Sequence, residues 1–228
     1  MIVAIHQPQY LPWLGYFEKM DRADAFCYLD NVQYKKNEWQ NRNRLKTAQG
    51  WQWITVPVHY RFPQKMIEVT VNDAVRWQRK HLQALVTNYK RAPFFNDYYA
   101  VFESILQNDF DRIVDLNIEM ITLVREILGL DEKPVIRAST LQPVEDPTGR
   151  LIDVCRHFGG STYLAGPDGR KYMDMNQFAE SGIAVVTQEF EHPEYSQCFG
   201  DFQSHMSIID LIFNCGPDSL SIIRKGRK

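Results

Sequence analysis

Four polar side chains stand at the end of the first apolar run of the chain, and they are His6, Gln7, Gln9 and Tyr10. An ordinary imidazole has a pKa near ~6.5, so a histidine can donate or accept a proton close to neutral pH. Carboxamides and a phenol orient a bound molecule through hydrogen bonds. These types predict a catalytic or phosphate-contacting role for His6 and substrate binding by the other three. The alternative is a satisfied structural histidine at a strand end.

Further polar groups follow two other predicted strands. Asp30, Asn31, Gln33 and Tyr34 follow the apolar stretch 25–29, and a Gly-Pro-Asp-Gly loop with Arg170 and Lys171 follows the stretch 161–165. Because ligands bind beyond the carboxyl ends of parallel strands, we expect these groups to gather at one edge as substrate-binding residues. Solvated surface loops are the alternative interpretation.

Gly15 lies near the start of a predicted helix over residues 15–22. A glycine permits close approach of a ligand or of backbone, and a helix N-terminus favours an anion. We therefore include Gly15 among the candidate binding residues.

The segment 34–46 is basic and rich in carboxamides, with a tryptophan at position 39. In an extended chain Arg42 and Arg44 face the same way, so they are candidates to clamp one phosphate or carboxylate. Asn41 is a further candidate ligand, and Trp39 and Tyr34 could stack on a base or a sugar. A solvated basic loop is the alternative.

The elements that must position these groups alternate along the chain. Strands are predicted at Ile2–His6 and at residues 25–29, 52–58, 65–71, 134–138, 161–165 and 183–188. Helices are predicted at residues 15–22, from Asp73 through Tyr89, at 94–110, from Asp111 through Ile127, and at 148–158, 173–181 and 204–215. This order predicts an α/β fold with a mostly parallel, Rossmann-like sheet flanked by helices. We expect one domain over residues 1–228, with residues 73–130 a helical insertion or subdomain.

Composition excludes several classes of protein. The chain has 228 residues and a formal net charge of −2, which disfavours a nonspecific nucleic-acid binder. No apolar run approaches the ~20 residues needed to span a bilayer, and no signal peptide is recognisable, so we expect a cytoplasmic protein. The four cysteines are scattered and the histidines have no metal-ligand spacing, so no metal site is predicted.

Three motifs carry a resemblance to a known family. The segments IHQPQYLPWLGYF (5–17), LDNVQY (29–34) and NRNR (41–44) resemble the WbqC-like protein family, and the similarity extends to YLAG at 163–166. That family occurs among bacterial genes for O-antigen, a part of lipopolysaccharide, and a glycine-transferase role has been proposed for it. The resemblance implies transfer of glycine or another aminoacyl group to a nucleotide-activated sugar. A nucleotide-sugar or another phosphate-bearing small molecule would then be the partner.

A fainter similarity connects the chain to the pantothenate-synthetase and nucleotidyltransferase group. The segment Asn31-Val32-Gln33-Tyr34 is comparable with an element of those enzymes, but their His-x-Gly-His motif is absent and Trp13-Leu14-Gly15-Tyr16 stands in its place. This similarity implies an ATP-dependent, adenylate-forming amide ligase that would use ATP and Mg²⁺; otherwise the cofactor is undefined. A noncatalytic module that binds a nucleotide or sugar phosphate is a further alternative, and binding of single-stranded RNA is disfavoured.

Overall fold

A five-stranded parallel sheet forms the centre of the computed structural model, which describes residues 1–171 and 173–228. The strands lie in the order β7 (Val135–Arg137), β2 (Ala25–Tyr28), β1 (Ile2–His6), β8 (Thr162–Ala165) and β9 (Ala184–Thr187). The central strand β1 pairs in parallel with β2 on one side and β8 on the other. The predicted α/β class with a mostly parallel sheet is therefore confirmed.

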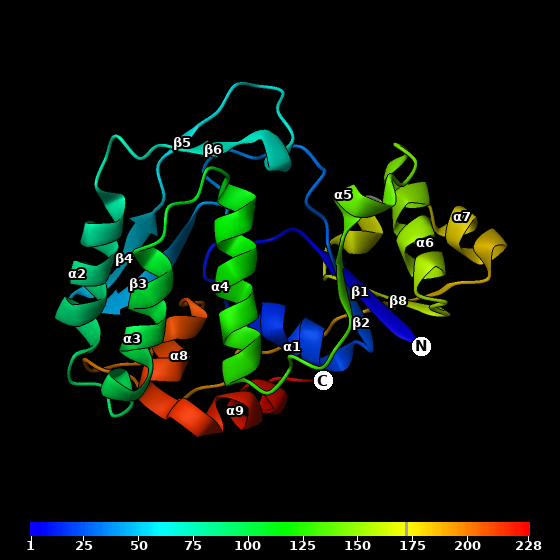
Figure 1. The fold of residues 1–228 in the computed structure, drawn as a ribbon. Helices are drawn as coiled ribbons and strands as arrows, with labels where there is room; N and C mark the ends of the chain where they lie inside the picture. The colour runs from blue at the N-terminus through cyan, green and yellow to red at the C-terminus, as the bar shows by residue number, and fades with distance from the viewer. Residues whose placement is uncertain (172) are drawn as a thin grey trace.

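Both faces of the sheet are covered by helices, as Figure 1 shows. Val3 and Ile5 of β1 pack with residues of α6 (Pro147–His157) and α7 (Met175–Ser181) on one face. Ala4 points to the opposite face, where α1 (Leu14–Arg22) and α4 (Ile113–Ile127) pack. Because alternate side chains of β1 enter two apolar clusters, the strand is apolar throughout rather than alternating.

The middle of the chain is helical, as predicted. Helices α2 (Trp77–Tyr89), α3 (Phe95–Leu106) and α4 lie side by side; α8 (Ile208–Cys215) packs against α3, and α9 (Ser219–Lys225) packs against α8 at the bottom of Figure 1. Asp73 does not cap α2, which begins at Trp77. Instead its Oδ1 accepts a hydrogen bond from the indole Nε1 of Trp77 at 3.3 Å.

The polar segment after β2 differs from the sequence-based expectation. It contains strand β3 (Arg42–Thr47), which forms an antiparallel hairpin with β4 (Gly50–Thr55) outside the main sheet. The inward residues of β3 include Asn43, which is buried and donates to the carbonyl of Leu11 at 2.7 Å. A polar residue can occupy this inward position because a backbone acceptor satisfies it.

The predicted strand over 65–71 is a short 3₁₀ turn, η1 (Met66–Glu68), followed by β6 (Thr70–Val71), which pairs with β5 (Val58–His59). The remaining short elements are α5 (Ala138–Leu141), η2 (Gly169–Lys171) and η3 (Gly216–Asp218). Within the described residues, no helix combines the length and the apolar character that crossing a bilayer requires.

Candidate functional site

A cavity of about 310 Å³ opens at the carboxyl edge of the sheet, where β1, β2 and β8 end. We call it the sheet-edge pocket, and its lining residues are Ile5, His6, Gln7, Lys19, Leu29, Tyr163, Gly166, Pro167, Asp168 and Gly169. The fold thus brings His6 and Gln7 together with the loop that follows β8.

His6 is half-buried in this pocket, and its ring centroid lies 4.9 Å from that of Tyr16 in an edge-to-face arrangement. Its Nδ1 lies 3.0 Å from the carbonyl oxygen of Gln7, which can only accept, so Nδ1 carries the proton. Burial lowers the pKa of His6 to about 4, and the charge of Lys19 lowers it further against the Gln7 bond. The imidazole is therefore neutral near pH 7, with its lone pair on Nε2.

Lys19 is a second ionisable group in the same pocket, and sequence reasoning missed it. Its side chain is buried, and Nζ donates to the carbonyl of Ile5 at 2.8 Å. Burial lowers the pKa of Lys19 to about 7, while the neighbouring charge of Glu18 opposes this shift. No spacing in the sequence marks Lys19, because only the packing of α1 against β1 shows that this lysine is buried.

Two residues of α1, Glu18 and Gly15, connect this helix to the C-terminal part of the chain. The buried carboxylate of Glu18 accepts from Arg227 at 2.8 Å and from the amide of Gln188 at 2.6 Å. Gln188 also donates to the carbonyl of Gly15 at 2.8 Å. A Cβ on Gly15 would stand 2.3 Å from a ring carbon of Trp13, so this glycine accommodates the indole.

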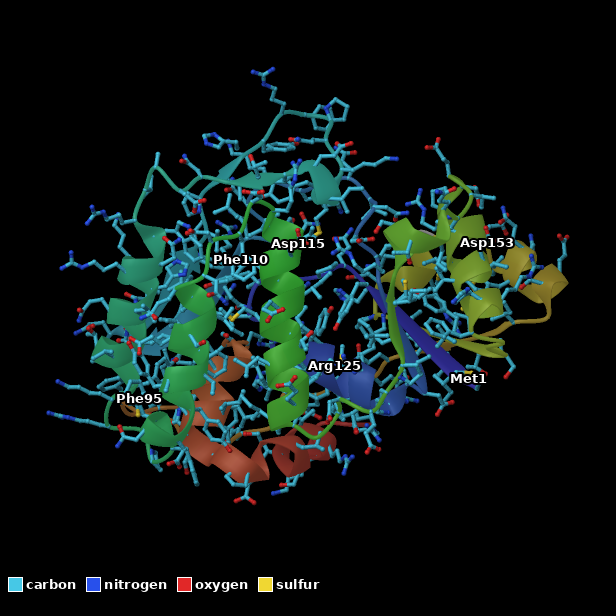
Figure 2. The ribbon with its side chains drawn as sticks, in the orientation of Figure 1. Met1, Phe95, Phe110, Asp115, Arg125 and Asp153 are labelled. Carbon is cyan, nitrogen blue, oxygen red and sulfur yellow. The ribbon has the colours of Figure 1, made fainter. Side chains whose placement is uncertain are left out.

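Asp30 lies beneath the sheet edge as a buried anchor. Its Oδ1 accepts from the backbone of Ser139 at 2.8 Å, and its Oδ2 accepts from Arg137 at 2.8 Å and from the Ser139 hydroxyl at 2.7 Å. Arg137 also pairs with Asp115 at 2.7 Å; Figure 2 shows Asp115 on the same helix, α4, as Arg125. Although burial opposes its charge, the hydrogen bonds that the Arg137 guanidinium donates to both carboxylates leave its pKa raised.

Asn31 and Gln33 line a different cavity, of about 390 Å³, together with Lys65, Glu68 and Arg150. Within the described residues, the Oδ1 of Asn31 is buried without a hydrogen-bond partner. The following tyrosine does not enter this cavity, since Tyr34 is buried against the ring of Tyr60 at 4.9 Å. Burial raises the pKa of Tyr34 to about 12.

The other predicted residues of the first loop and its neighbour lie in the interior. Tyr10 has no exposed surface, and its hydroxyl donates to Nδ1 of His81 at 2.8 Å. Asn41 donates to the carbonyl of Val56 at 2.9 Å. Gln9 is buried, and its Oε1 lacks a partner among the described residues. Tyr10 and Asn41 therefore support the loop from within.

The side-chain amides of Gln40 and Asn117 hold the first loop against the rest of the molecule. The Oε1 of Gln7 accepts from the side chain of Gln40 at 2.7 Å. Asn117 of α4 is buried and donates to the carbonyls of Gln40 at 2.7 Å and Pro8 at 3.3 Å. The helical middle of the chain therefore fixes the loop that carries His6 and Gln7.

Arg42 and Arg44 do not line the sheet-edge pocket. They form an indole–arginine cluster with Trp39, Trp51 and Trp53 on one face of the β3–β4 hairpin. The Cζ atom of Arg42 lies 4.2 Å from the ring centroid of Trp53, and that of Arg44 lies 4.5 Å from Trp51 and 5.3 Å from Trp39. The two guanidinium groups do face the same way, but they stack on indoles.

Arg170 and Lys171 lie beyond the pocket in η2. Arg170 donates weakly to the carbonyl of Val185 at 3.5 Å and lines a separate cavity beside β9. Lys171 pairs with Asp168 at 2.6 Å, and Asp168 itself lines the sheet-edge pocket. Lys171 therefore contacts a residue of the pocket rim.

Comparison with known proteins finds one matching family model and a relative that covers nearly the whole chain. The model of the WbqC-like protein family matches residues 7–222. An uncharacterised protein of Mycobacterium tuberculosis, Rv1507c, is 35% identical over 230 residues, which cover 99% of each chain. An arylacetonitrilase of Aspergillus niger is 34% identical over 79 residues, only 35% of this chain and 24% of that enzyme. No solved structure matches. The chain belongs to the WbqC-like protein family.

Proposed function

We propose that the chain is a group transferase of bacterial surface-polysaccharide biosynthesis, which moves glycine or another aminoacyl group onto a nucleotide-activated amino sugar in the sheet-edge pocket. The observation that carries this proposal is the presence of His6 and Lys19 in one cavity. Acyl transfer to an amine requires a base at the reacting nitrogen, and this cavity offers two nitrogen bases. The class of substrate is the one that the resemblance to the WbqC-like family implies.

The proposed step moves one acyl group and one proton. The acceptor amine attacks the activated carbonyl carbon, the new C–N bond forms, and the bond to the activating group breaks with its electron pair leaving on that group. The nitrogen then gives up a proton. A general base works best when its pKa is near the working pH, so Lys19, with a pKa of about 7, takes this proton rather than His6, with a pKa of about 4.

His6 has an orienting role in this scheme. Its Nδ1–H is committed to Gln7 at 3.0 Å, and the lone pair on Nε2 accepts a hydrogen bond from the acceptor amine or an adjacent hydroxyl. Within the described residues, Nε2 has no protein hydrogen-bond donor of its own, which supports this role.

The charged part of the substrate would lie in the neighbouring cavity. Leu29 lines the sheet-edge pocket, and Asn31, two residues further along the chain, lines the cavity with Lys65 and Arg150. Cations and the unpartnered oxygen of Asn31 suit phosphate and ribose or sugar hydroxyls. If the acyl group is activated as an adenylate, ATP and Mg²⁺ are needed as co-substrates.

Incubation of the full chain with ATP, Mg²⁺, glycine and a panel of nucleotide-linked amino sugars, followed by mass spectrometry, tests this function. We expect one acceptor to gain the mass of a glycyl residue. Lys19→Met should slow the gain by about 10²-fold or more, while Lys36→Met, a change at an exposed lysine outside the pocket, should preserve its rate. Absence of any mass gain across a broad panel of acyl donors and amino-sugar acceptors would refute the proposal.

A noncatalytic module that binds a nucleotide or sugar phosphate is the second candidate. The hydrogen bond from Lys19 to Ile5 favours it, because a purely structural lysine would make the same contact. Measuring nucleotide-sugar affinity and turnover for His6→Gln separates the two. A transferase loses turnover with affinity retained, whereas a binding module shows no turnover before or after the change.

A further inference from the structure

A second cleft, of about 590 Å³, lies between the β3–β4 hairpin and helix α2 and shares no lining residue with the sheet-edge pocket. Its wall consists of one indole, four carboxamides, two threonine hydroxyls, one cation and one alanine. The principal lining side chains are Trp51, Gln49, Gln52, Gln83, Asn88 and Lys80. We propose that this cleft binds an oligosaccharide.

The polar part of the wall suits a chain of hydroxyl groups. A carboxamide presents two donor hydrogens and an acceptor oxygen, and a sugar hydroxyl both donates and accepts. Asn88 uses its nitrogen to donate to Ala84 at 2.8 Å, which leaves its oxygen as an acceptor. Gln83 donates to Thr87 at 3.1 Å and stands exposed on the same helix. Among the described residues no carboxylate lines the cleft, so carboxamides and hydroxyls supply most of its hydrogen-bonding groups.

The apolar part of the wall is a rigid indole. Trp51 is 42% exposed, an unusual exposure for so large an aromatic side chain. It is held in place by Arg44, whose Cζ lies 4.5 Å from its ring centroid, and by the edge of Trp53 at 5.4 Å. A fixed aromatic surface binds a ligand with little loss of side-chain entropy, and an indole can pack against the C–H face of a sugar ring.

The charge of the cleft argues against a nucleic acid. Binding of single strands requires a positive groove that follows the phosphates, whereas among the described residues Lys80 is the one cation that lines this cleft. An oligosaccharide needs no such groove. Its binding should therefore change little with salt, in contrast to the steep salt dependence of a phosphate chain.

An oligosaccharide array probed with the labelled full chain tests the proposal, followed by calorimetric titration of the best ligand at low and high salt. An oligouridylate serves as the competing probe. We expect at least one oligosaccharide to bind with little salt dependence. Trp51→Ala should weaken binding by about tenfold or more, Trp51→Phe by less, and Gln83→Ala by several-fold.

Two controls make the outcome specific. Phe62→Ala removes another strongly exposed aromatic ring that does not line the cleft, and it should leave affinity unchanged. His6→Gln should also leave affinity unchanged, so loss of transferase activity and loss of this binding are separable. Binding of none of the arrayed oligosaccharides, binding that survives both Trp51→Ala and Gln83→Ala, or binding of the oligouridylate alone would overturn the proposal.

Discussion

The sheet-edge pocket and the indole–arginine cluster each place basic side chains next to aromatic rings. The lysine of the pocket has a lowered pKa, whereas the arginines of the cluster stay charged. The Nζ atom of Lys19 lies 5.9 Å from the ring centroid of Tyr163, and burial of this side chain lowers its pKa to about 7. Arg42 and Arg44 stack on indoles at 4.2 and 4.5 Å. A guanidinium is planar, weakly hydrated and always charged, whereas a buried ammonium readily loses its proton. Burial of a lysine therefore creates a base, and stacking of an arginine creates a rigid surface.

The pH dependence of transfer gives the largest expected effect. Below pH 7 Lys19 is protonated and cannot accept a proton, so the rate should fall about tenfold per pH unit on acidification and level off above pH 7. Lys19→Met should remove most of the rate, by about 10²-fold or more. Arg44→Met should leave both the rate and its pH profile intact. A profile of Arg44→Met that loses its inflection near pH 7 would contradict the distinction between the two regions.

Asn117 offers a test of how the pocket loop is held. Asn117→Leu leaves the carbonyls of Pro8 and Gln40 without their buried donor, which should lower the free energy of unfolding by about 1–3 kcal/mol. Urea denaturation measures this loss. The matched change Asn176→Leu, at an exposed position of α7, should cost much less. Equal effects of the two changes would mean that the amide of Asn117 does not hold the loop.

The pH dependence of the free energy of unfolding tests one histidine from each region. Burial lowers the pKa of His6 in the pocket and of His81 beside the hairpin to about 4. Between pH 6.5 and 4 the unfolded chain binds more protons at these sites than the native chain, so the free energy of unfolding should fall as the pH falls through this window. His6→Gln should make the fall shallower in denaturation curves at several pH values. A slope unchanged by His6→Gln would show that this imidazole titrates normally.

The smallest expected effect concerns the hairpin. Arg44→Met removes stacking of a cation on indoles, and contacts of this kind contribute about 0.5–1 kcal/mol at exposed sites. Thermal denaturation should show a small decrease in melting temperature. Arg61→Met, at an exposed arginine for which no ring contact is found among the described residues, is the control and should show no decrease. A large loss of stability in Arg44→Met would mean that the cluster is a main support of the fold.

The sequence predicted the parts of the molecule that depend on local patterns. Strand β1 occurs at the predicted residues, and the rule that polar loops gather at the carboxyl edge brought His6 and Gln7 to a cavity. Strand β3 was missed because its inward Asn43 resembles a loop residue until its acceptor, Leu11, is known. The one-domain arrangement with a helical insertion over 73–130 stays a prediction.

Contacts between distant residues explain the rest of the site. Asp30 is a buried anchor because Arg137 and Ser139 reach it from more than a hundred positions away. Lys19 was missed because a lysine in a short helix usually lies in solvent, and only packing against β1 shows that it is desolvated. Neither the contacts of Asp30 nor the burial of Lys19 can be predicted from the spacing of nearby residues.

The amide of Asn117 also bears on how the chain emerges from the ribosome. The buried amide that holds the carbonyl of Pro8 is available only once residue 117 has been synthesised, and β1 acquires its second neighbour only with β8, about 160 residues later. The nascent chain therefore presents an apolar, half-paired strand for most of its synthesis, a condition that favours misassembly. This topology makes the protein a candidate for dependence on chaperones during translation.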